Sequence, residues 1–531
     1  MSSLDSTAPF AHSPVPPTSQ PTGVHAQDTA SYPGVAPRQV VRKEDGTEVE
    51  LVTFPPGDES NPRNWPLWRK WSIVAVIIPI DLTVSWGASG FSPGVEKFEK
   101  DFGVGSEIGT LGLSIYVLGL AFGPMTLAPL SEYYGRSPIY ILSYGVFLFM
   151  LVGTALVDNL GGFLALRILS GLFSSVTIAN FGGTIADLFE PHETGIPMSF
   201  FLWAATFGSP SGYFLFSWIA QYKPWRDIFW ALLGICGGFW LIMTITLKET
   251  RHSIILIRRA AKERKERGTH AIEVPDSMKQ RGVKQLFQVA LSRPFRFLFT
   301  EAIIVFGALY NGYLYGLSFL FNTAFPIVFG PAGHGFKISK IGMSFLGIMV
   351  GISIGPITNL WQERYYQKRI ARKGSKDEPE ARVQMSQLAG ITFPISLFWF
   401  AWTSFTSVHW IVPIIASALW GWSFYTLILM TYMYTEDSYK VFSASALAGL
   451  GLVRNVAGAG FPLFGKQMFQ NLGNQWAAST LAFLALLMIP IPFILAHKGR
   501  SLRLRSPWAR QHMDDLTEEE EEADKDLSQE A

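Results

Sequence analysis

The chain alternates long apolar stretches with short polar connections. A helix needs about 20 mostly apolar residues to cross the hydrocarbon core of a bilayer. Six such stretches lie near 71–91, 107–130, 138–157, 161–186, 196–218 and 227–247. Six more lie near 297–326, 338–361, 385–405, 409–434, 441–465 and 476–497. The pattern predicts an all-α polytopic membrane protein with about twelve transmembrane helices in two six-helix halves, over 71–247 and 297–497.

Three polar regions flank these halves. Residues 1–70 begin with a stretch rich in Ser, Pro and Thr, which predicts a disordered tail. This stretch lacks the basic and apolar segments of a signal peptide, so we expect the first span to direct insertion. Residues 248–296 form a polar, basic linker, and residues 498–531 form a second tail that ends in the acidic run "TEEEEEADKD".

The basic residues indicate how the chain lies in the membrane. Lys and Arg are dense in the linker, in residues 362–384 and after residue 497, whereas the alternate loops contain few. Cytoplasmic loops of membrane proteins carry an excess of Lys and Arg. We therefore expect both termini and the linker to be cytoplasmic.

The amino-acid composition limits the classes of molecule that the protein is expected to bind. Hydrophobic residues make up 49% of the 531 residues and charged residues only 16%, which argues against a multidomain soluble protein. The net charge of +2 argues against a nucleic-acid partner, and the single cysteine, Cys236, cannot form an intramolecular disulfide. We expect the partners to be the lipid bilayer, a small-molecule substrate and protons. We also expect no cofactor other than the proton gradient, and a chain that works as a monomer.

Four ionisable residues fall well inside the predicted spans: Asp81, Arg167, Glu301 and Arg454. Such a residue at a helix centre costs about 2.5–3.5 kcal/mol, so it normally faces a polar cavity or a partner. Asp81 and Arg167 lie at similar depths from opposite ends, and they would form a pair if their helices are neighbours. A buried carboxylate near an arginine suits a proton carrier, and the alternative is a permanent structural salt bridge.

The evidence for a functional role is weaker for the other polar and aromatic residues in the spans. Glu301 lies near the inner end of its span, where snorkelling to the interface is the simplest interpretation. Arg454 lines a cavity or takes part in packing. Aromatic and amide residues gather in the seventh and tenth spans, where Tyr310, Asn311 and Tyr425 are candidates for a substrate pocket. The alternative for these aromatic residues is an interfacial belt.

Several segments resemble a known family. The loop "APLSEYYGRSP", residues 128–138, resembles the signature loop of the major facilitator superfamily. "ALRILSGL" in the fourth span resembles the Arg-x-x-x-Gly signature of its proton antiporters. "NPRNWPLWRKW", "KETRHSIILIRRA" and "RNVAGAGFPLF" resemble the fungal twelve-spanning drug:proton antiporter group. The similarity covers about residues 61–508 and implies the major facilitator fold.

The resemblance also implies roles for individual residues. Glu132 and Arg136 would act with Asp187 in a cytoplasmic charge relay that holds the outward-facing state. Helix capping is a local alternative for Glu132. Arg167 matches the arginine of the antiporter signature, which is associated with proton coupling.

The sequence departs from the family pattern in two places. Ala128 stands where the superfamily usually has glycine at the start of the signature loop. In the fifth span, "FGSPSGYF" keeps only Pro210 and Gly212 of the antiporter pattern Gly-Pro-x-x-Gly-Gly. Because that pattern is associated with export, the direction of transport is less firmly predicted than the fold.

These features favour a proton-coupled exporter in the plasma membrane, with the vacuolar membrane as an alternative. The substrate would be a secondary metabolite, an organic acid such as an itaconate-type dicarboxylate, or a drug. The altered fifth span favours a second hypothesis, a symporter or facilitator for uptake of a small metabolite. A transporter-like sensor or a membrane enzyme is less favoured. His409 and His497 stand alone at helix ends, so we do not expect an enzyme.

Overall fold

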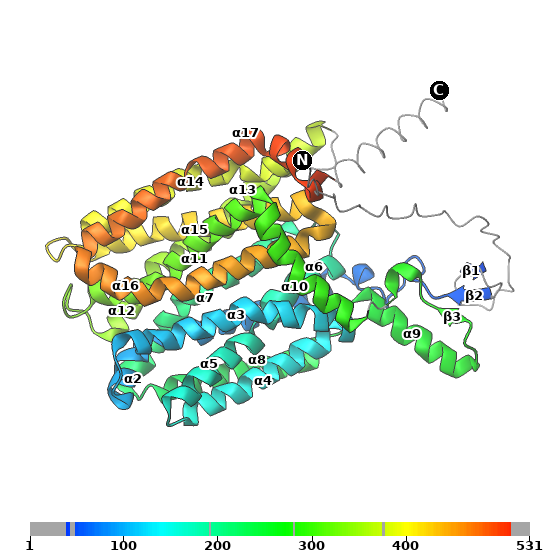
Figure 1. Ribbon diagram of the computed structural model, residues 1–531, viewed down its shortest axis with the longest axis horizontal. Helices are drawn as coiled ribbons and strands as arrows, with labels where there is room; N and C mark the ends of the chain where they lie inside the picture. The colour runs from blue at the N-terminus through cyan, green and yellow to red at the C-terminus, as the bar shows by residue number, and fades with distance from the viewer. Residues whose placement is uncertain (1–38, 43–47, 191–192, 280–281, 374–377, 511–531) are drawn as a thin grey trace, which may run out of the picture. The chain divides into compact units, whose positions relative to one another are not determined.

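The computed structural model describes residues 39–42, 48–190, 193–279, 282–373 and 378–510 (Figure 1). Contacts divide the chain into two units. The smaller unit contains the described residues up to Asp58 together with Leu256–Lys279. The larger unit contains Glu59–Ile255 and the described residues that follow Lys279.

The smaller unit is built on three short strands, β1 (Gln39–Arg42), β2 (Glu48–Leu51) and β3 (Ile272–Glu273). β1 pairs antiparallel with β2, which pairs parallel with β3. The basic helix α9 (His252–Arg267) contributes its residues from Leu256 onward to this unit. A small apolar core joins strands and helix, and it consists of Val52, Leu256, Ala260, Ile272 and Val274.

The larger unit is a bundle of long helices that forms two successive series. The first series is α1 (Leu67–Ser89), α3 (Ser106–Tyr134), α4 (Arg136–Leu156), α5 (Leu160–Ser174), α6 (Val176–Leu188), α7 (Gly195–Tyr222) and α8 (Arg226–Thr246). Shorter pieces accompany it, namely η1 (Pro62–Asn64), η2 (Ser92–Gly94) and α2 (Val95–Phe102). Most of these helices start and end at the glycine, proline and polar positions that separate the apolar stretches of the sequence.

The second series follows after η4 (Asp276–Met278) and the connecting helix α10 (Val283–Thr300). Its helices are α11 (Ala302–Phe329), α12 (Ile338–Ser344), α13 (Leu346–Lys373), α14 (Gln384–Thr403), α15 (Ile411–Tyr439), α16 (Ser443–Met488) and α17 (Pro490–Arg505). Two short turns join them, η5 (Pro379–Val383) and η6 (Lys440–Phe442). The two series pack on each other where α16 meets α3 and where α12 and α13 meet α7.

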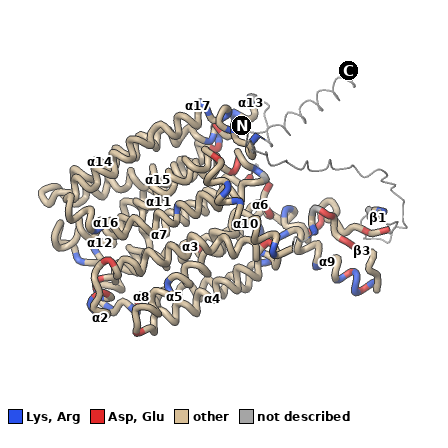
Figure 2. The backbone as a smooth tube through the Cα atoms, in the orientation of Figure 1, with Lys and Arg blue, Asp and Glu red and all other residues tan. Residues whose placement is uncertain are grey.

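Nine helical stretches in the described part of the chain are long and apolar enough to cross a membrane. The last one, Ser443–Arg505, has 63 residues and changes direction at Gly473, where φ is 76°. That length suffices for two crossings, and α7 and α14 lie in the same bundle. The arrangement is consistent with the twelve crossings that the sequence predicts. Figure 2 shows that charged residues gather near the ends of the helices.

Three local features differ from the sequence expectations. Strands at 39–42 and 48–51 lie in the range expected to be a disordered tail, because β2 finds a partner strand in the linker. The linker is not simply polar chain, since it contains α9, β3 and α10. Residues 362–373, expected in a loop, continue α13. The first 38 residues and the acidic run near the end lie outside the described residues.

We call the end of the bundle that carries Gly135 and Gly195 the inner end, and the opposite end the outer end. At the outer end the two series are joined by polar contacts. The backbone N–H of Ser339 donates to Gln221 Oε1 at 3.0 Å, and Gln467 donates to Glu107. These contacts tie α12 to α7 and α16 to α3.

Candidate functional site

Arg167 is completely buried on α5 and binds backbone rather than a carboxylate. Its Nε donates to the carbonyl of Gly112 at 2.8 Å, and Nη1 donates to the carbonyl of Gly87 at 2.7 Å. The guanidinium carbon lies 4.6 Å from the centre of the Tyr116 ring. The expected pair with Asp81 is therefore absent from the described residues. Arg167 instead ties α5 to α1 and α3, which shows that the two side chains point to different neighbours.

Asp81 lies near the middle of α1 and is 2% exposed. Thr177 Oγ1, on α6, donates to Asp81 Oδ1 at 2.7 Å, whereas Oδ2 has no hydrogen-bond partner. The positive charge that acts on this carboxylate is that of Arg454, on α16 of the second series. One oxygen of a buried carboxylate is thus left to take up a proton or another donor.

Arg454 stands among aromatic rings. Its guanidinium carbon lies 4.6 Å from the centre of the Tyr315 ring and 5.5 Å from that of Tyr432. Its Nε has no hydrogen-bond partner. The next residue, Asn455, donates to the carbonyl of Leu120 on α3 at 3.4 Å. Arg454 is thus a buried cation held over two aromatic rings, with its Nε unpartnered, where α16 of the second series contacts α3 of the first.

A charged cluster closes the inner end of the first series. Arg136 Nε lies 3.4 Å from Asp187 Oδ2, and Arg136 Nη1 donates to Ser131 Oγ at 2.8 Å. The backbone N–H of Arg136 donates to Glu249 Oε1 at 2.9 Å. The structure thus brings together Arg136 and Asp187, whereas Glu132 makes no ion pair with either in the described chain. Glu249, which follows α8, takes the additional acidic position.

A second charged cluster occupies the matching place in the second series. Arg382, on η5, forms an ion pair with Glu363 of α13 and lies 3.0 Å from Asp437 of α15. Its guanidinium also lies 3.5 Å from the centre of the Tyr366 ring. Although burial lowers the pKa of Arg382, the carboxylates of Asp437 and Glu363 outweigh it and raise that pKa above its usual range. Among the described residues, no three His, Cys, Asp or Glu side chains are grouped to hold a metal ion.

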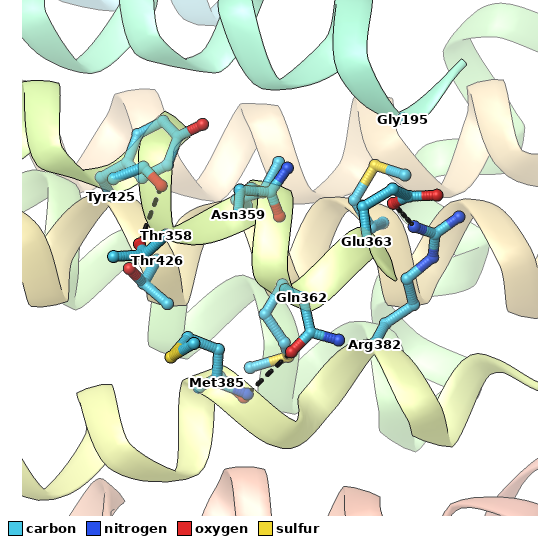
Figure 3. A pocket seen from close by; sticks show the side chains of 14 residues that line it. Gly195, Thr358, Asn359, Gln362, Glu363, Arg382, Met385, Tyr425 and Thr426 are labelled. Atoms are coloured by element: carbon cyan, nitrogen blue, oxygen red, sulfur yellow. Dashed lines mark hydrogen bonds and ion pairs between the residues drawn. The ribbon is translucent and has the colours of Figure 1, made fainter. Parts of the chain in front are cut away.

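A narrow cavity lies beside this second cluster (Figure 3). Tyr425, one of the predicted pocket residues, lines it and shares a 2.6 Å hydrogen bond with Ser199 Oγ of α7. Tyr310 and Asn311 are buried on α11 but do not line this cavity, and Asn311 donates to the carbonyl of Gly307. The polar residues that line it with Tyr425 are Thr358, Asn359, Gln362, Glu363, Arg382, Ser386 and Thr426.

Glu301 is only 1% exposed, so its side chain does not extend into solvent as snorkelling would require. Tyr439 donates to Glu301 Oε2 at 2.9 Å, and Ser506 donates to the same oxygen. These two partners cover the carboxylate at the junction of α10 and α11. Glu301 therefore fixes the inner end of the second series.

Comparison with known proteins identifies the family. Residues 71–440 match the family described as the Major Facilitator Superfamily. The chain belongs to this superfamily. The resemblance seen in the signature segments is confirmed, and the protein is a multi-pass membrane transporter and not an enzyme.

Two fungal members of the superfamily are similar over most of the chain. The chain is 36% identical over 482 residues to the major facilitator superfamily multidrug transporter mdrA of Aspergillus fumigatus, covering 90% of this chain and 79% of the relative. It is 35% identical over 459 residues to the efflux pump FUBT of Fusarium oxysporum, covering 86% and 77%.

Solved structures of the superfamily confirm the fold. The partially occluded, inward-open xylose transporter XylE from E. coli matches with a TM-score of 0.56 and 16% identity, over 80% of this chain and 97% of XylE. The human organic anion transporter MFSD10 matches with a TM-score of 0.54 and 16% identity, over 81% of this chain and all of MFSD10.

None of the residues in the second charged cluster was predicted from the sequence as a functional residue. One signal was available, because "WQERYYQKR" at 361–369 repeats the Glu and Tyr-Tyr residues of "SEYYGR" at 131–136. Glu363 then falls at the end of the second span of its series, as Glu132 does in the first. The partner Thr177 of Asp81 carried no such signal, since threonine is common inside spans.

Proposed function

We propose that this transporter is a proton-coupled exporter of a small organic compound, and that Asp81 carries the proton. The supporting observation is the environment of Asp81, which is buried, has one oxygen without a partner, and feels the charge of Arg454 from the second series. The names of the fungal relatives, a multidrug transporter and an efflux pump, support export.

The coupling would use the change of charge on Asp81. An ionised Asp81 attracts Arg454 across the contact between the series, whereas a protonated Asp81 does not. Protonation therefore changes how strongly the two series are held together at this depth. A difference in free energy between two conformations is what a ligand or proton needs to shift their equilibrium. Arg167, fixed to α1 and α3, would keep α1 in place during this change.

The exported compound would be a secondary metabolite, an organic acid such as an itaconate-type dicarboxylate, or a drug. We place the transporter in the plasma membrane, with the vacuolar membrane as the alternative, and infer that one chain forms one pathway. Arg136 and Asp187 would act as the conformational relay at the inner end, with Glu249 in the acidic position that Glu132 was expected to hold.

The first experiment identifies the compound. Metabolites inside and outside cells of the native organism are compared with those of a strain that lacks the gene. We expect one compound to accumulate inside the deletion strain and to decrease in the medium. A nutrient that fails to enter the deletion strain, with no compound retained, would contradict export and favour uptake.

The second experiment tests the proton carrier. The full-length protein is reconstituted into liposomes, and movement of the identified compound is measured with an imposed pH gradient. Asp81→Asn should abolish the response to the gradient while exchange of the compound across the membrane continues. The matched control is Asp158→Asn, since the Asp158 side chain is 90% exposed. A full gradient response in Asp81→Asn would show that Asp81 does not carry the proton.

A further inference from the structure

The linker helix α9 carries six Lys and Arg residues within ten positions, from Arg258 to Arg267 (Figure 2). It follows α8, a helix long and apolar enough to cross a membrane, after residues 247–251 only. Five residues of chain span at most about 20 Å, so α9 starts close to the bilayer. A cluster of Lys and Arg in this position is typical of segments that bind anionic lipid headgroups. The number of basic side chains that point outward decides whether α9 can do so.

Three of the six basic side chains hold α9 to the rest of the smaller unit. Arg259 Nη1 donates to Asp58 Oδ2 at 2.6 Å. Arg264 Nε donates to the carbonyl of Ile272 in β3, also at 2.6 Å. Arg267 Nη1 lies 3.2 Å from a carboxylate of β2. These three arginines are therefore engaged by the fold itself.

The other three basic side chains form a stripe on the opposite face of the helix. Arg258, Lys262 and Lys265 follow one another at spacings of four and three residues, which places them on one side of an α-helix. All three are exposed. Leu256 and Ala260 lie on the other side, in the small apolar core beneath α9. We call Arg258, Lys262 and Lys265 the basic stripe.

One acidic residue borders the basic stripe. Lys262 Nζ lies 3.8 Å from Glu266 Oε1, one turn further along the helix. The two side chains are 77% and 61% exposed, and an ion pair in such contact with water contributes little to stability. An anionic ligand can therefore replace Glu266 beside Lys262 at small cost.

We propose that the basic stripe binds the anionic headgroups of phospholipids in the cytoplasmic leaflet. A row of cations on one side of a helix is complementary to a surface that presents many anionic groups. The apolar side of α9 is covered by the strands, so α9 would bind by charge at the membrane surface without inserting apolar side chains. The linker is expected to be cytoplasmic, and the cytoplasmic leaflet carries the anionic lipids.

Fluorescence quenching with the full-length protein in nanodiscs tests this proposal. Ala261→Cys places a thiol-linked fluorophore beside the basic stripe, since Ala261 is exposed, whereas the native Cys236 is buried and inert. The quencher is phosphatidylcholine with a nitroxide on its headgroup, in bilayers of phosphatidylcholine with or without phosphatidylserine. We expect phosphatidylserine to increase the quenching. The increase should disappear at about 1 M salt, where charges are screened beyond about 3 Å.

Two double variants separate the basic stripe from the charge of the whole protein. Lys262→Gln with Lys265→Gln removes two of the three cations of the stripe. Each basic residue near an anionic surface favours binding about fivefold, so the ratio of docked to undocked helix should fall about thirtyfold. The matched control, Lys498→Gln with Arg500→Gln, removes the same charge from exposed positions on α17. It should leave the quenching unchanged.

Four results would overturn the proposal. The first two are equal quenching in the two kinds of bilayer and undiminished quenching in the variant of the stripe. A loss of the same size in the control variant would show that net charge, and not the stripe, is responsible. Quenching that phosphatidylserine increases only after deletion of residues 517–526 would assign the stripe to that acidic run. The measurement needs no substrate and no gradient, so its outcome is independent of the proposed export.

Discussion

Replacing Gly135 with alanine should destabilise the inner end of the first series. Gly135 joins α3 to α4 with φ 107° and ψ 157°, a conformation that is essentially restricted to glycine. Forcing another residue into such a region costs about 1–3 kcal/mol. In addition, a Cβ on Gly135 would lie 2.2 Å from Glu249 Oε2, so the Glu249 side chain must move.

Moving Glu249 has a second cost. Its Oε1 accepts hydrogen bonds from the backbone N–H groups of Arg136, Thr250 and Arg251 at 2.9, 3.1 and 3.0 Å. A hydrogen bond to a charged group contributes about 1.5–3 kcal/mol net. Loss of one such bond together with the backbone strain gives an expected destabilisation of about 2.5–6 kcal/mol for Gly135→Ala.

Equilibrium unfolding of the full-length protein in mixed detergent micelles measures this loss. The control is Gly234→Ala on α8, where a Cβ meets no atom within 4 Å and alanine favours the helix. In a Glu249→Ala background, Gly135→Ala should cost only the backbone strain. If Gly135→Ala lowers the unfolding free energy no more than Gly234→Ala does, neither the backbone strain nor the displacement of Glu249 is significant. If Gly135→Ala costs the same with and without Glu249→Ala, the displacement of Glu249 contributes nothing.

Three further outcomes are expected. Arg382→Ala leaves Asp437 buried without its cation and should lower the unfolding free energy by about 3–5 kcal/mol in the same assay. A loss smaller than that of a surface arginine variant would show that Arg382 does not stabilise this cluster. The ammonium group of a lysine at position 167 lacks the planar fork with which Arg167 binds the carbonyls of Gly87 and Gly112. Arg167→Lys should therefore abolish export, while gel filtration shows a folded protein. Burial, and then the charge of His409, lower the pKa of His334. The unfolded chain therefore binds that proton more readily, and stability should fall as pH drops below about 6.5, less so in His334→Gln, as unfolding at several pH values would show.

Helices that depend on local hydropathy were predictable from the sequence. α11 (Ala302–Phe329) closely follows the predicted span 297–326, because a stretch of about 20 mostly apolar residues has few alternatives to a membrane helix. The interruption at Ser175, between α5 and α6, was not predicted, since it does not lower the hydropathy of its stretch. The change of direction at Gly473 falls in the polar segment between the predicted spans 441–465 and 476–497. The pairing of β2 with β3 joins residues about 220 positions apart, which no local pattern encodes.

Side-chain partners were predictable only where a motif specified them. The family resemblance implied a relay of Glu132, Arg136 and Asp187, and the structure pairs Arg136 with Asp187. Depth along a helix suggested that Asp81 and Arg167 meet, but depth does not fix the rotation of each helix about its axis. That rotation directs Asp81 towards Thr177 and Arg167 towards the carbonyls of α1 and α3.

The two charged clusters repeat one arrangement with one difference. In each, an arginine at or just before the start of a helix (Arg136 of α4, Arg382 before α14) meets an aspartate near the end of another (Asp187 of α6, Asp437 of α15). The second cluster also includes Glu363, whose Oε2 lies 3.0 Å from the position of a Cβ on Gly195, at the start of α7 in the first series. Any motion that opens the inner end between α7 and α13 must therefore withdraw this carboxylate from the positive end of the α7 dipole. The second cluster bears directly on such a motion, whereas the described contacts of Arg136 and Asp187 reach only the first series and the residues 249–252 that follow α8.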